Sequence, residues 1–170
     1  MDAEEPTRTQ QSIPTLGAHD IECFADGGEA PWLAVANVRD DETQRVGSAL
    51  YEWRADADAF VEVQRISTLG GHDWEALHAG GHRLLAVANQ GESSDACGTG
   101  SVDVFWRRGG RFEPLQTLRD VGCAVHLHAF WAGSGVFLAV AIERRDESGG
   151  GGYATSSLVF EWVAQPGGVT

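Results

Sequence analysis

Two pairs of acidic residues have the type and spacing that could support chemistry. Asp20 and Glu22 form one pair, and Asp73 and Glu75 form the other. Glycosidases use two carboxylates held on either side of a glycosidic bond. Asp20 and Asp73 are also candidate ligands for a hard cation such as Ca²⁺, which takes carboxylate oxygens. The structural interpretation, which we favour, is that each Asp accepts hydrogen bonds from backbone N–H groups at a turn.

A second group, Cys123, His126 and His128, is the one set with spacing suited to a transition metal. Histidines two positions apart on a strand point the same way and can share a Zn²⁺ ion. The sequence offers no clear fourth ligand, so these residues are only weak metal candidates. We expect no cofactor, and Ca²⁺ in a central channel is the one exception that the sequence leaves open.

Enzyme motifs are missing from the sequence, and its charge restricts the partners. It has no G-x-S-x-G, no P-loop and no H-E-x-x-H, and the acidic pairs recur at equivalent repeat positions, which favours architecture over an active site. We therefore predict a non-enzymatic protein. The net charge of −13 disfavours nucleic acid and anionic membranes and favours basic protein surfaces.

The sequence does not indicate the cellular compartment of the protein. Cys23, Cys97 and Cys123 are an odd and sparse set, unlike a disulfide framework. The first residues are acidic and polar, unlike a secretory signal, and no apolar run approaches the ~20 residues that span a bilayer.

Three landmarks recur in the same order at an interval of about 53 residues, which is the mark of a repeat protein. The first is Leu-Gly-Ala-His-Asp at 16–20, with Leu-Gly-Gly-His-Asp at 69–73 and a degenerate copy at 121–125, where Val125 takes the place of Asp. The second is the Leu-Ala-Val-Ala type, at 32–37, 84–89 and 137–142, with Ile142 in place of the final Asn. The third ends in Trp53, Trp106 and Trp162.

Each repeat divides into four short strands. In the second repeat we predict Asp73–Ala79, Arg83–Asn89, Ser101–Arg107 and Phe112–Leu118, with Gly-rich turns between the first two and between the last two. The Leu-Ala-Val-Ala strand is apolar on both faces and must be covered on both. Stacked blades of a β-propeller provide that cover, and we assign the three Trp residues to packing between blades.

The motifs resemble the epilepsy-associated repeat family, called EAR or EPTP. The resemblance rests on Gly-x-x-Asp, Leu-Ala-Val-Ala-Asn, Tyr-x-Trp and Phe-x-x-x-Gln elements over residues 8–163. It implies an all-β propeller, normally of seven blades, in extracellular or cell-surface proteins that bind other proteins. This chain departs from that pattern in having three repeats.

We predict an all-β protein of three four-stranded antiparallel blades. The expected parts are a disordered tail at 1–7, blade 1 at about 17–68, blade 2 at about 70–118, blade 3 at about 122–163 and a tail at 166–170. Blade 3 lacks an outer strand, and a spare strand at 8–14, with Gln11 in register with Gln64 and Gln116, is available to complete it. Three blades cannot close into a ring of ~4–8. A head-to-tail homodimer with six blades and a fragment of a larger propeller are the two alternatives.

The long loops between the second and third strands of each repeat should share one rim, beside the links between blades. Long loops on a rigid scaffold are common binding sites, and these are acidic. The predicted binding residues are Asp40, Asp41, Glu42, Glu92, Asp95, Asp146 and Glu147. The sequence thus favours a protein-interaction module with an acidic rim. The alternative is a lectin-like propeller that binds a cation or glycan in its central channel.

Overall fold

The computed structural model describes residues 9–25, 29–92, 99–144 and 155–163. These residues contain eleven strands and no α-helix. The strands are β1 (Ala18–Phe24), β2 (Trp32–Asn37), β3 (Gly47–Arg54), β4 (Ala59–Ser67), β5 (Gly71–Ala79), β6 (His82–Asn89), β7 (Ser101–Arg108), β8 (Arg111–Arg119), β9 (Ala124–Ala132), β10 (Gly135–Ile142) and β11 (Leu158–Glu161).

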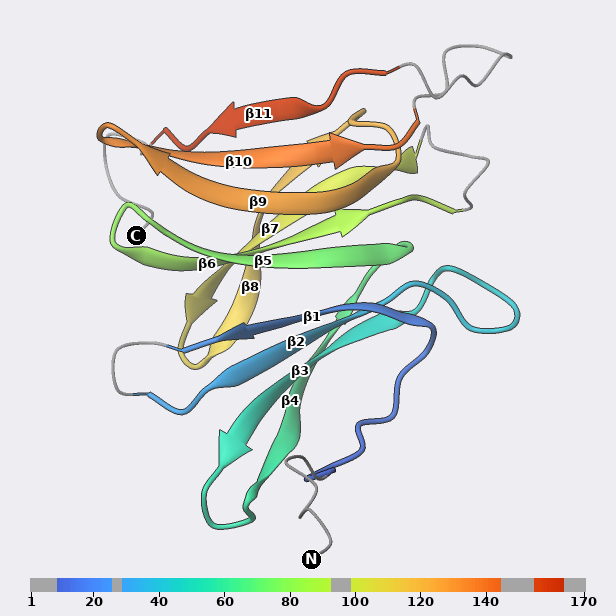
Figure 1. The fold of residues 1–170 in the computed structure, drawn as a ribbon, viewed down its shortest axis with the longest axis vertical. Coiled ribbons are helices and arrows are strands. Elements are labelled where there is room, and N and C mark those ends of the chain that lie inside the picture. Colours follow the sequence, from blue (N-terminus) through green and yellow to red (C-terminus); the bar gives the residue numbers. More distant parts are fainter. Residues whose placement is uncertain (1–8, 26–28, 93–98, 145–154, 164–170) are drawn as a thin grey trace, which may run out of the picture.

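The strands form three antiparallel sheets that stack in chain order (Figure 1). Blade 1 is the sheet β1-β2-β3-β4, blade 2 is β5-β6-β7-β8, and blade 3 has the three described strands β9, β10 and β11. The inner strand β5 lies between β1 and β9. Sheets that stack face to face with their first strands side by side are the arrangement of propeller blades, so the predicted all-β class is confirmed.

The second strands of blades 1 and 2 form the core and are covered on both faces, as their apolar sequences predict. Ala34, Val35 and Ala36 of β2 have no exposed surface, and the same holds for residues 84–88 of β6. Short alanines alternate with larger side chains, which lets sheets approach closely while both faces are filled. The hydrophobic effect on these two-sided strands therefore holds the blades together.

Aromatic side chains fill the junction between blades 1 and 2 at the end where the β1–β2 and β7–β8 connections lie. The ring of Phe112, from β8, packs edge-on against Phe24 and Trp32 of blade 1, with ring centroids 6.0 and 5.8 Å apart. All three residues are buried. Edge-to-face contact is a favourable geometry for aromatic rings, so blade 2 is anchored on blade 1 by one inserted ring.

A glutamine on β4 ties the backbone of the next blade. The Gln64 side chain donates to the Phe112 carbonyl at 2.7 Å and accepts from the Phe112 N–H at 2.9 Å. In the register of the β7–β8 hairpin, the N–H and carbonyl of Phe112 point away from β7 and do not pair with it. The Gln64 side-chain amide therefore satisfies two polar groups that burial would otherwise leave unpaired.

The Asn that ends the Leu-Ala-Val-Ala-Asn element holds the link between blades. Asn89 accepts from the Leu69 N–H at 3.1 Å, and Asn37 accepts from the Leu16 N–H at 3.0 Å. Both asparagines are 1% exposed. Ile142 has no such acceptor, and there the link is held by backbone bonds in which Cys123 N–H donates to Arg144 and Glu143 N–H donates to Cys123.

Two repeat equivalences suggested by the sequence are wrong by one residue. Leu33 and Leu85 pair with Tyr51 and Phe105, so Tyr51 corresponds to Phe105 and not to Val104. Trp106 consequently packs toward blade 3, whereas Trp53 packs against Phe60 on the opposite side of its own blade. The three Trp residues do not share one position.

The second error concerns the inner strand of blade 3. Asp20 pairs with Ala36, Asp73 with Ala88 and His126 with Ala141, so His126 and not Val125 stands where the other blades have Asp. By the same register His128 takes the place of Glu22 and Glu75. The Asp-x-Glu element of blades 1 and 2 is therefore His-x-His in blade 3.

Candidate functional site: a groove on the long-loop rim

The long loops of blades 1 and 2 meet at the link between the blades. The Gly70 N–H donates to the Gln44 carbonyl at 2.8 Å, and the Gln90 N–H donates to the Gly70 carbonyl at 2.9 Å. The link thus joins the β2–β3 loop to the β6–β7 loop through backbone bonds. Gly70 has a φ of +64°, and a Cβ there would lie 2.9 Å from the Gln44 side chain and the Gly91 carbonyl, so glycine is required for this close approach.

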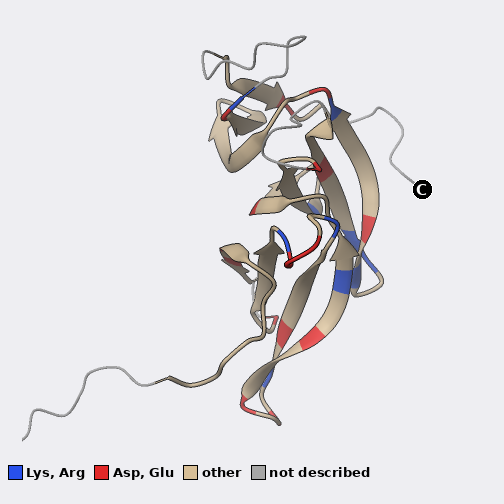
Figure 2. Cartoon of the chain, turned by 90° about the vertical axis from the view of Figure 1, so that its right-hand side faces the viewer, with Lys and Arg blue, Asp and Glu red and all other residues tan. Residues whose placement is uncertain are grey.

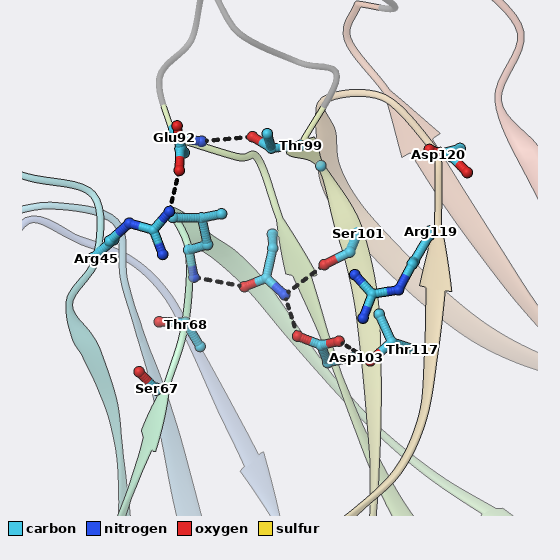
Figure 3. A pocket seen from close by; sticks show the side chains of 13 residues that line it. Arg45, Ser67, Thr68, Glu92, Thr99, Ser101, Asp103, Thr117, Arg119 and Asp120 are labelled. Carbon is cyan, nitrogen blue, oxygen red and sulfur yellow. Dashed lines mark hydrogen bonds and ion pairs between the residues drawn. The ribbon is translucent and has the colours of Figure 1, made fainter.

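An open polar groove of about 660 Å³ lies at this junction (Figure 3). Its walls come from the blade 1 loop, the link, and the ends of β7 and β8. The lining residues are Arg45, Ser67, Thr68, Leu69, Asn89, Glu92, Thr99, Gly100, Ser101, Asp103, Thr117, Arg119 and Asp120. They are distant in the sequence, and only the stacking of the two blades brings them together.

Both signs of charge are present in the groove. Arg45 of blade 1 forms an ion pair with Glu92 of blade 2 across the opening, and Arg119 and Asp120 lie on the opposite side (Figure 3). Arg45 and Glu92 are well exposed. Because exposed ion pairs contribute little to stability, this pair can be exchanged for contacts with a ligand at small cost.

Asp103 forms a fixed acidic floor in the groove. Its carboxylate accepts from the Asn89 amide at 2.7 Å and from the Thr117 hydroxyl at 2.6 Å. Both oxygens are held, which fixes the side chain in one orientation. A floor of this kind can accept further hydrogen bonds from a polar or cationic ligand, since each carboxylate oxygen has more than one acceptor position.

The predicted rim residues fall into four groups. Asp40 is an internal cap of the β2–β3 loop, because its carboxylate accepts from the Glu42 and Thr43 N–H groups at 2.9 and 2.7 Å. These hydrogen bonds lower the pKa of the Asp40 carboxyl. Asp41 and Glu42 are exposed on the same loop, and Glu92 lines the groove. Asp95, Asp146 and Glu147 lie outside the described residues.

The rim is more mixed in charge than its acidic residues alone suggest. Figure 2 shows blue and red segments side by side at several places along the chain. The described rim includes Arg39, Arg45, Arg119 and Arg144 besides its acids. The net charge of −13 remains the dominant long-range field, whereas local contacts in the groove offer both donors and acceptors.

The carboxylate pairs of the inner strands are used between blades. Oxygens of Asp20 and Glu22 accept from the Trp74 and Ala76 N–H groups at 3.1 and 3.3 Å. One blade further on, Asp73 and Glu75 accept from residues 127 and 129, both at 2.7 Å. Each pair therefore bonds the backbone of the next inner strand, the kind of N–H contact that the structural interpretation expected, although across a blade junction and not within a turn.

Burial at these junctions changes the acidity of the carboxyls. The pKa values of Glu22, Asp73 and Glu75 are raised, chiefly by desolvation, and nearby carboxylates raise them further. The hydrogen bonds from backbone N–H groups oppose this by favouring the charged form. A raised carboxyl pKa often marks a proton donor in catalysis, but here the same groups are occupied by the structural bonds between blades.

The weak metal candidates do not come together as a ligand set. Cys123 is disulfide-bonded, so its sulfur is not a free thiolate. Cys97 lies outside the described residues, and Cys23 is free and exposed. His126 lies 3.1 Å from Asp73, and His128 lies 3.9 Å from Glu75. The described part of the chain has no group of three or more His, Cys, Asp or Glu side chains that could hold a metal ion.

Stacked antiparallel blades joined side to side, with a repeat of about fifty residues, define a β-propeller repeat protein. Over 139 residues the chain is 37% identical to the human thrombospondin-type laminin G domain and EAR repeat-containing protein, a match that covers 81% of this chain and 20% of that protein. The mouse protein of the same name is 38% identical over 79 residues, covering 46% of this chain and 12% of that protein. Both relatives are named for EAR repeats, which agrees with the resemblance that the repeat motifs of this chain indicate.

The chain spans about a fifth or less of the length of these relatives. No family model matches the chain. Within the described residues no helix is long and apolar enough to cross a membrane.

Proposed function

We propose that the protein is a non-enzymatic binding module whose long-loop rim is the binding surface for another protein. The observation that carries the proposal is the groove between blades 1 and 2, which is open, polar and formed by loops on a rigid core. Its residues are suited to hydrogen bonds and ion pairs with a polypeptide, and its openness suits a protein segment better than an enclosed small molecule. The similarity to EAR repeat-containing proteins supports an interaction role.

A basic partner surface is the best complement. The chain carries a net charge of −13, and Asp41 and Glu42 are exposed on the β2–β3 loop, which also supplies Arg45 to the groove. An acidic surface speeds association with a basic one and fixes its orientation. Glu92 then exchanges its contact with Arg45 for a contact with the partner, while Arg45 and Arg119 select acidic groups at the edge of the bound surface.

The proposed location is outside the cell or on its surface. Cys123 is disulfide-bonded, and disulfides persist in oxidising compartments. Purified extracellular domains are therefore the appropriate collection in which to search for partners.

The test compares charge reversal on the two rims. Purified extracellular domains are arrayed and probed with the chain, and each binder is measured again with the double variant Asp41→Arg/Glu42→Arg. Asp40 is left unchanged because it caps the loop. We expect the dissociation constant to rise at least about tenfold, and binding of the original chain to weaken with salt.

The matched control is the double variant Asp56→Arg/Glu113→Arg. It also replaces one Asp and one Glu, and both lie exposed at or beside the β3–β4 and β7–β8 hairpins of the opposite rim. Binding by this control should stay close to that of the original chain. Equal loss in both variants would show a nonspecific charge effect, and retention of binding by the Asp41→Arg/Glu42→Arg variant would refute the rim as the binding surface.

A further inference from the structure

Residues 9–16 lie on blade 1 in the way that an outer strand lies on the blade that follows it. The Gln11 amide donates to the Phe60 carbonyl at 2.8 Å and accepts from the Phe60 N–H at 2.9 Å. Gln64 makes the same two bonds with Phe112. Gln11 therefore binds the backbone of blade 1 in the same way that Gln64, on the outer strand of blade 1, binds the backbone of blade 2.

Two further contacts of this segment follow the same pattern. Ile13 packs against Val35 and Tyr51 on the outer face of blade 1, just as Ile66 of β4 packs in the junction between blades 1 and 2. The Leu16 N–H donates to an asparagine as the Leu69 N–H does. Within the described residues this segment pairs with no strand, so it is an outer strand without a sheet.

Blade 3 shows the reverse. In the described part of the chain its sheet ends at β11, which pairs with β10 on one side only. An apolar pocket of about 110 Å³, bordered by Leu118, Phe160 and Trp162, lies where blades 2 and 3 meet. Gln116 lies at the edge of that pocket; its backbone pairs with β7, but its exposed side-chain amide has no hydrogen-bond partner among the described residues. Blade 3 is a sheet that is open to an outer strand.

The face of blade 3 that points away from blade 2 is also open among the residues that the structure describes. Ala139 and Ala141 are partly exposed, whereas the corresponding residues of blade 1, Ala34 and Ala36, have no exposed surface. Val159 is 62% exposed, although its counterpart Leu50 is fully buried. The open face of blade 3 is thus lined by apolar residues at the same positions as the covered faces of blades 1 and 2.

Aromatic residues on the open face of blade 3 and on the outer face of blade 1 stand at the positions that pack together between blades 1 and 2. Phe130 and Phe137 of blade 3 stack at 5.4 Å, and they occupy the positions that Phe24 and Trp32 occupy in blade 1. Phe60 occupies the position of Phe112, the ring that packs against that pair. Placing blade 3 of one copy against blade 1 of another would bring Phe60 onto Phe130 and Phe137 and repeat the junction between blades 1 and 2.

We propose that the occupant of the open face of blade 3 is blade 1 of a second copy of this chain, with residues 9–16 of that copy added as the outer strand beside β11. Two copies joined twice in this manner form a closed ring of six blades with twofold symmetry, within the ~4–8 blades that propellers contain. A second copy is favoured over another partner because this one chain carries both halves of the junction, each repeating contacts already made between its own blades.

The first measurement is the mass of the 170-residue chain in solution by light scattering and native mass spectrometry. The expected result is a species of twice the chain mass of 18.2 kDa. Two single variants should each give a folded monomer: Val159→Arg, which changes the open face of blade 3, and Ile21→Arg, at a position 53% exposed on blade 1. Val61→Arg, at an exposed residue of β4, is the matched control and should remain a dimer.

Mixing the two variants tests the direction of the junction. Each variant lacks one side of the junction, so a mixture of Val159→Arg with Ile21→Arg has one intact junction between an unchanged blade 3 and an unchanged blade 1. We expect a heterodimer in the mixture, although neither variant associates alone. Restored association is specific to a head-to-tail arrangement, because a contact between two copies of the same face cannot be restored in this way.

Three results would overturn the proposal. A folded chain that stays monomeric up to about 100 μM, a concentration that detects even weak dimers, would assign the junction to other repeats of a longer chain. A dimer that survives Val159→Arg would place the interface elsewhere. A closed ring of three or more copies would contradict the twofold ring. None of these outcomes depends on partner binding at the rim.

Discussion

Replacing Gln64 by Ala tests whether the glutamine on the outer strand holds successive blades together. The substitution removes two hydrogen bonds, 2.7 and 2.9 Å long, to the backbone of Phe112. Phe112 is 2% exposed, so water replaces the lost partners poorly. A net loss of about 1 kcal/mol for each bond, increased by the desolvation of the unpaired groups, gives about 2–3 kcal/mol in the free energy of unfolding.

Urea denaturation measures this loss directly, and thermal denaturation should show a fall in Tm of about 2–4 °C for each kcal/mol in a protein of this size. Both proteins must be compared at one concentration, because any self-association adds to the apparent stability. Two further variants separate the loss of the hydrogen bonds from the loss of side-chain packing and from the removal of an exposed glutamine. Gln64→Met keeps the length of the side chain but removes both bonds, and Gln10→Ala removes only an exposed contact with Asp58.

We expect Gln64→Met to lose most of what Gln64→Ala loses, and Gln10→Ala to change the free energy of unfolding by no more than about 0.5 kcal/mol. A Gln64→Met variant as stable as the original chain would refute the hydrogen-bond explanation. The glutamine would then act only by packing, and the similar contact between Gln11 and Phe60 would lose its meaning as a sign of an outer strand.

Two further predictions concern the inner strands and the links. Burial raises the pKa of the Asp73 carboxyl, so the folded state holds the carboxyl proton more tightly than the unfolded chain does. The contribution of Asp73 to the free energy of unfolding is therefore most favourable at low pH. It falls as the pH rises from the unfolded pKa of about 3.9 through the folded pKa. Asp73→Asn keeps an acceptor for the Leu127 N–H and should remove this part of the slope in urea denaturation measured across that range, and an unchanged slope would contradict the assignment. Gly70→Ala should cost about 1–3 kcal/mol, because a Cβ would lie 2.9 Å from two oxygens. Gly109→Ala, also at positive φ but with no atom within 4 Å, should cost less in the same denaturation assay, and equal losses would show that crowding at Gly70 is unimportant.

The sequence was sufficient to predict the sheets, because the repeats carry strong local signals. The two-sided apolar strand requires cover on both faces, and the Gly-Gly turns at 80–81 and 109–110 indicate hairpins, which the structure contains. The same evidence failed at the level of single residues. Aligning Trp106 with Trp53 shifts the third strand of blade 2 by one position, and a shift of one residue exchanges the two faces of a strand. Trp106 and Trp53 therefore pack on opposite faces of their blades.

The contacts between blades could not be read from the sequence, because they join residues about fifty positions apart through backbone atoms. The spacing of Asp20 and Glu22 indicates only a pair of carboxylates, and nothing in it shows that they accept from the Trp74 and Ala76 N–H groups. The groove cannot be predicted from the sequence for the same reason, because Arg45, Asp103 and Arg119 share no motif and line one groove only after the blades stack. Its one clue in the sequence was the length of the loops.

The change from Asp-x-Glu to His-x-His in blade 3 connects the repeat pattern with the proposed assembly. In blades 1 and 2 the carboxylates accept from the next inner strand, and burial raises the pKa of Asp73 and Glu75. A third carboxylate pair at 126 and 128 would add negative charge beside Asp73 and Glu75. Because each nearby like charge makes ionisation of a carboxyl more costly, the three pairs would disfavour one another's charged forms. Histidines end that accumulation, because a neutral imidazole can still accept from a backbone N–H through one ring nitrogen. In the six-bladed ring the N–H groups of Ile21 and Cys23 of the second copy would take the places of Trp74 and Ala76. The inner strands could then continue their bonds around the ring without an unbroken circle of buried carboxylates.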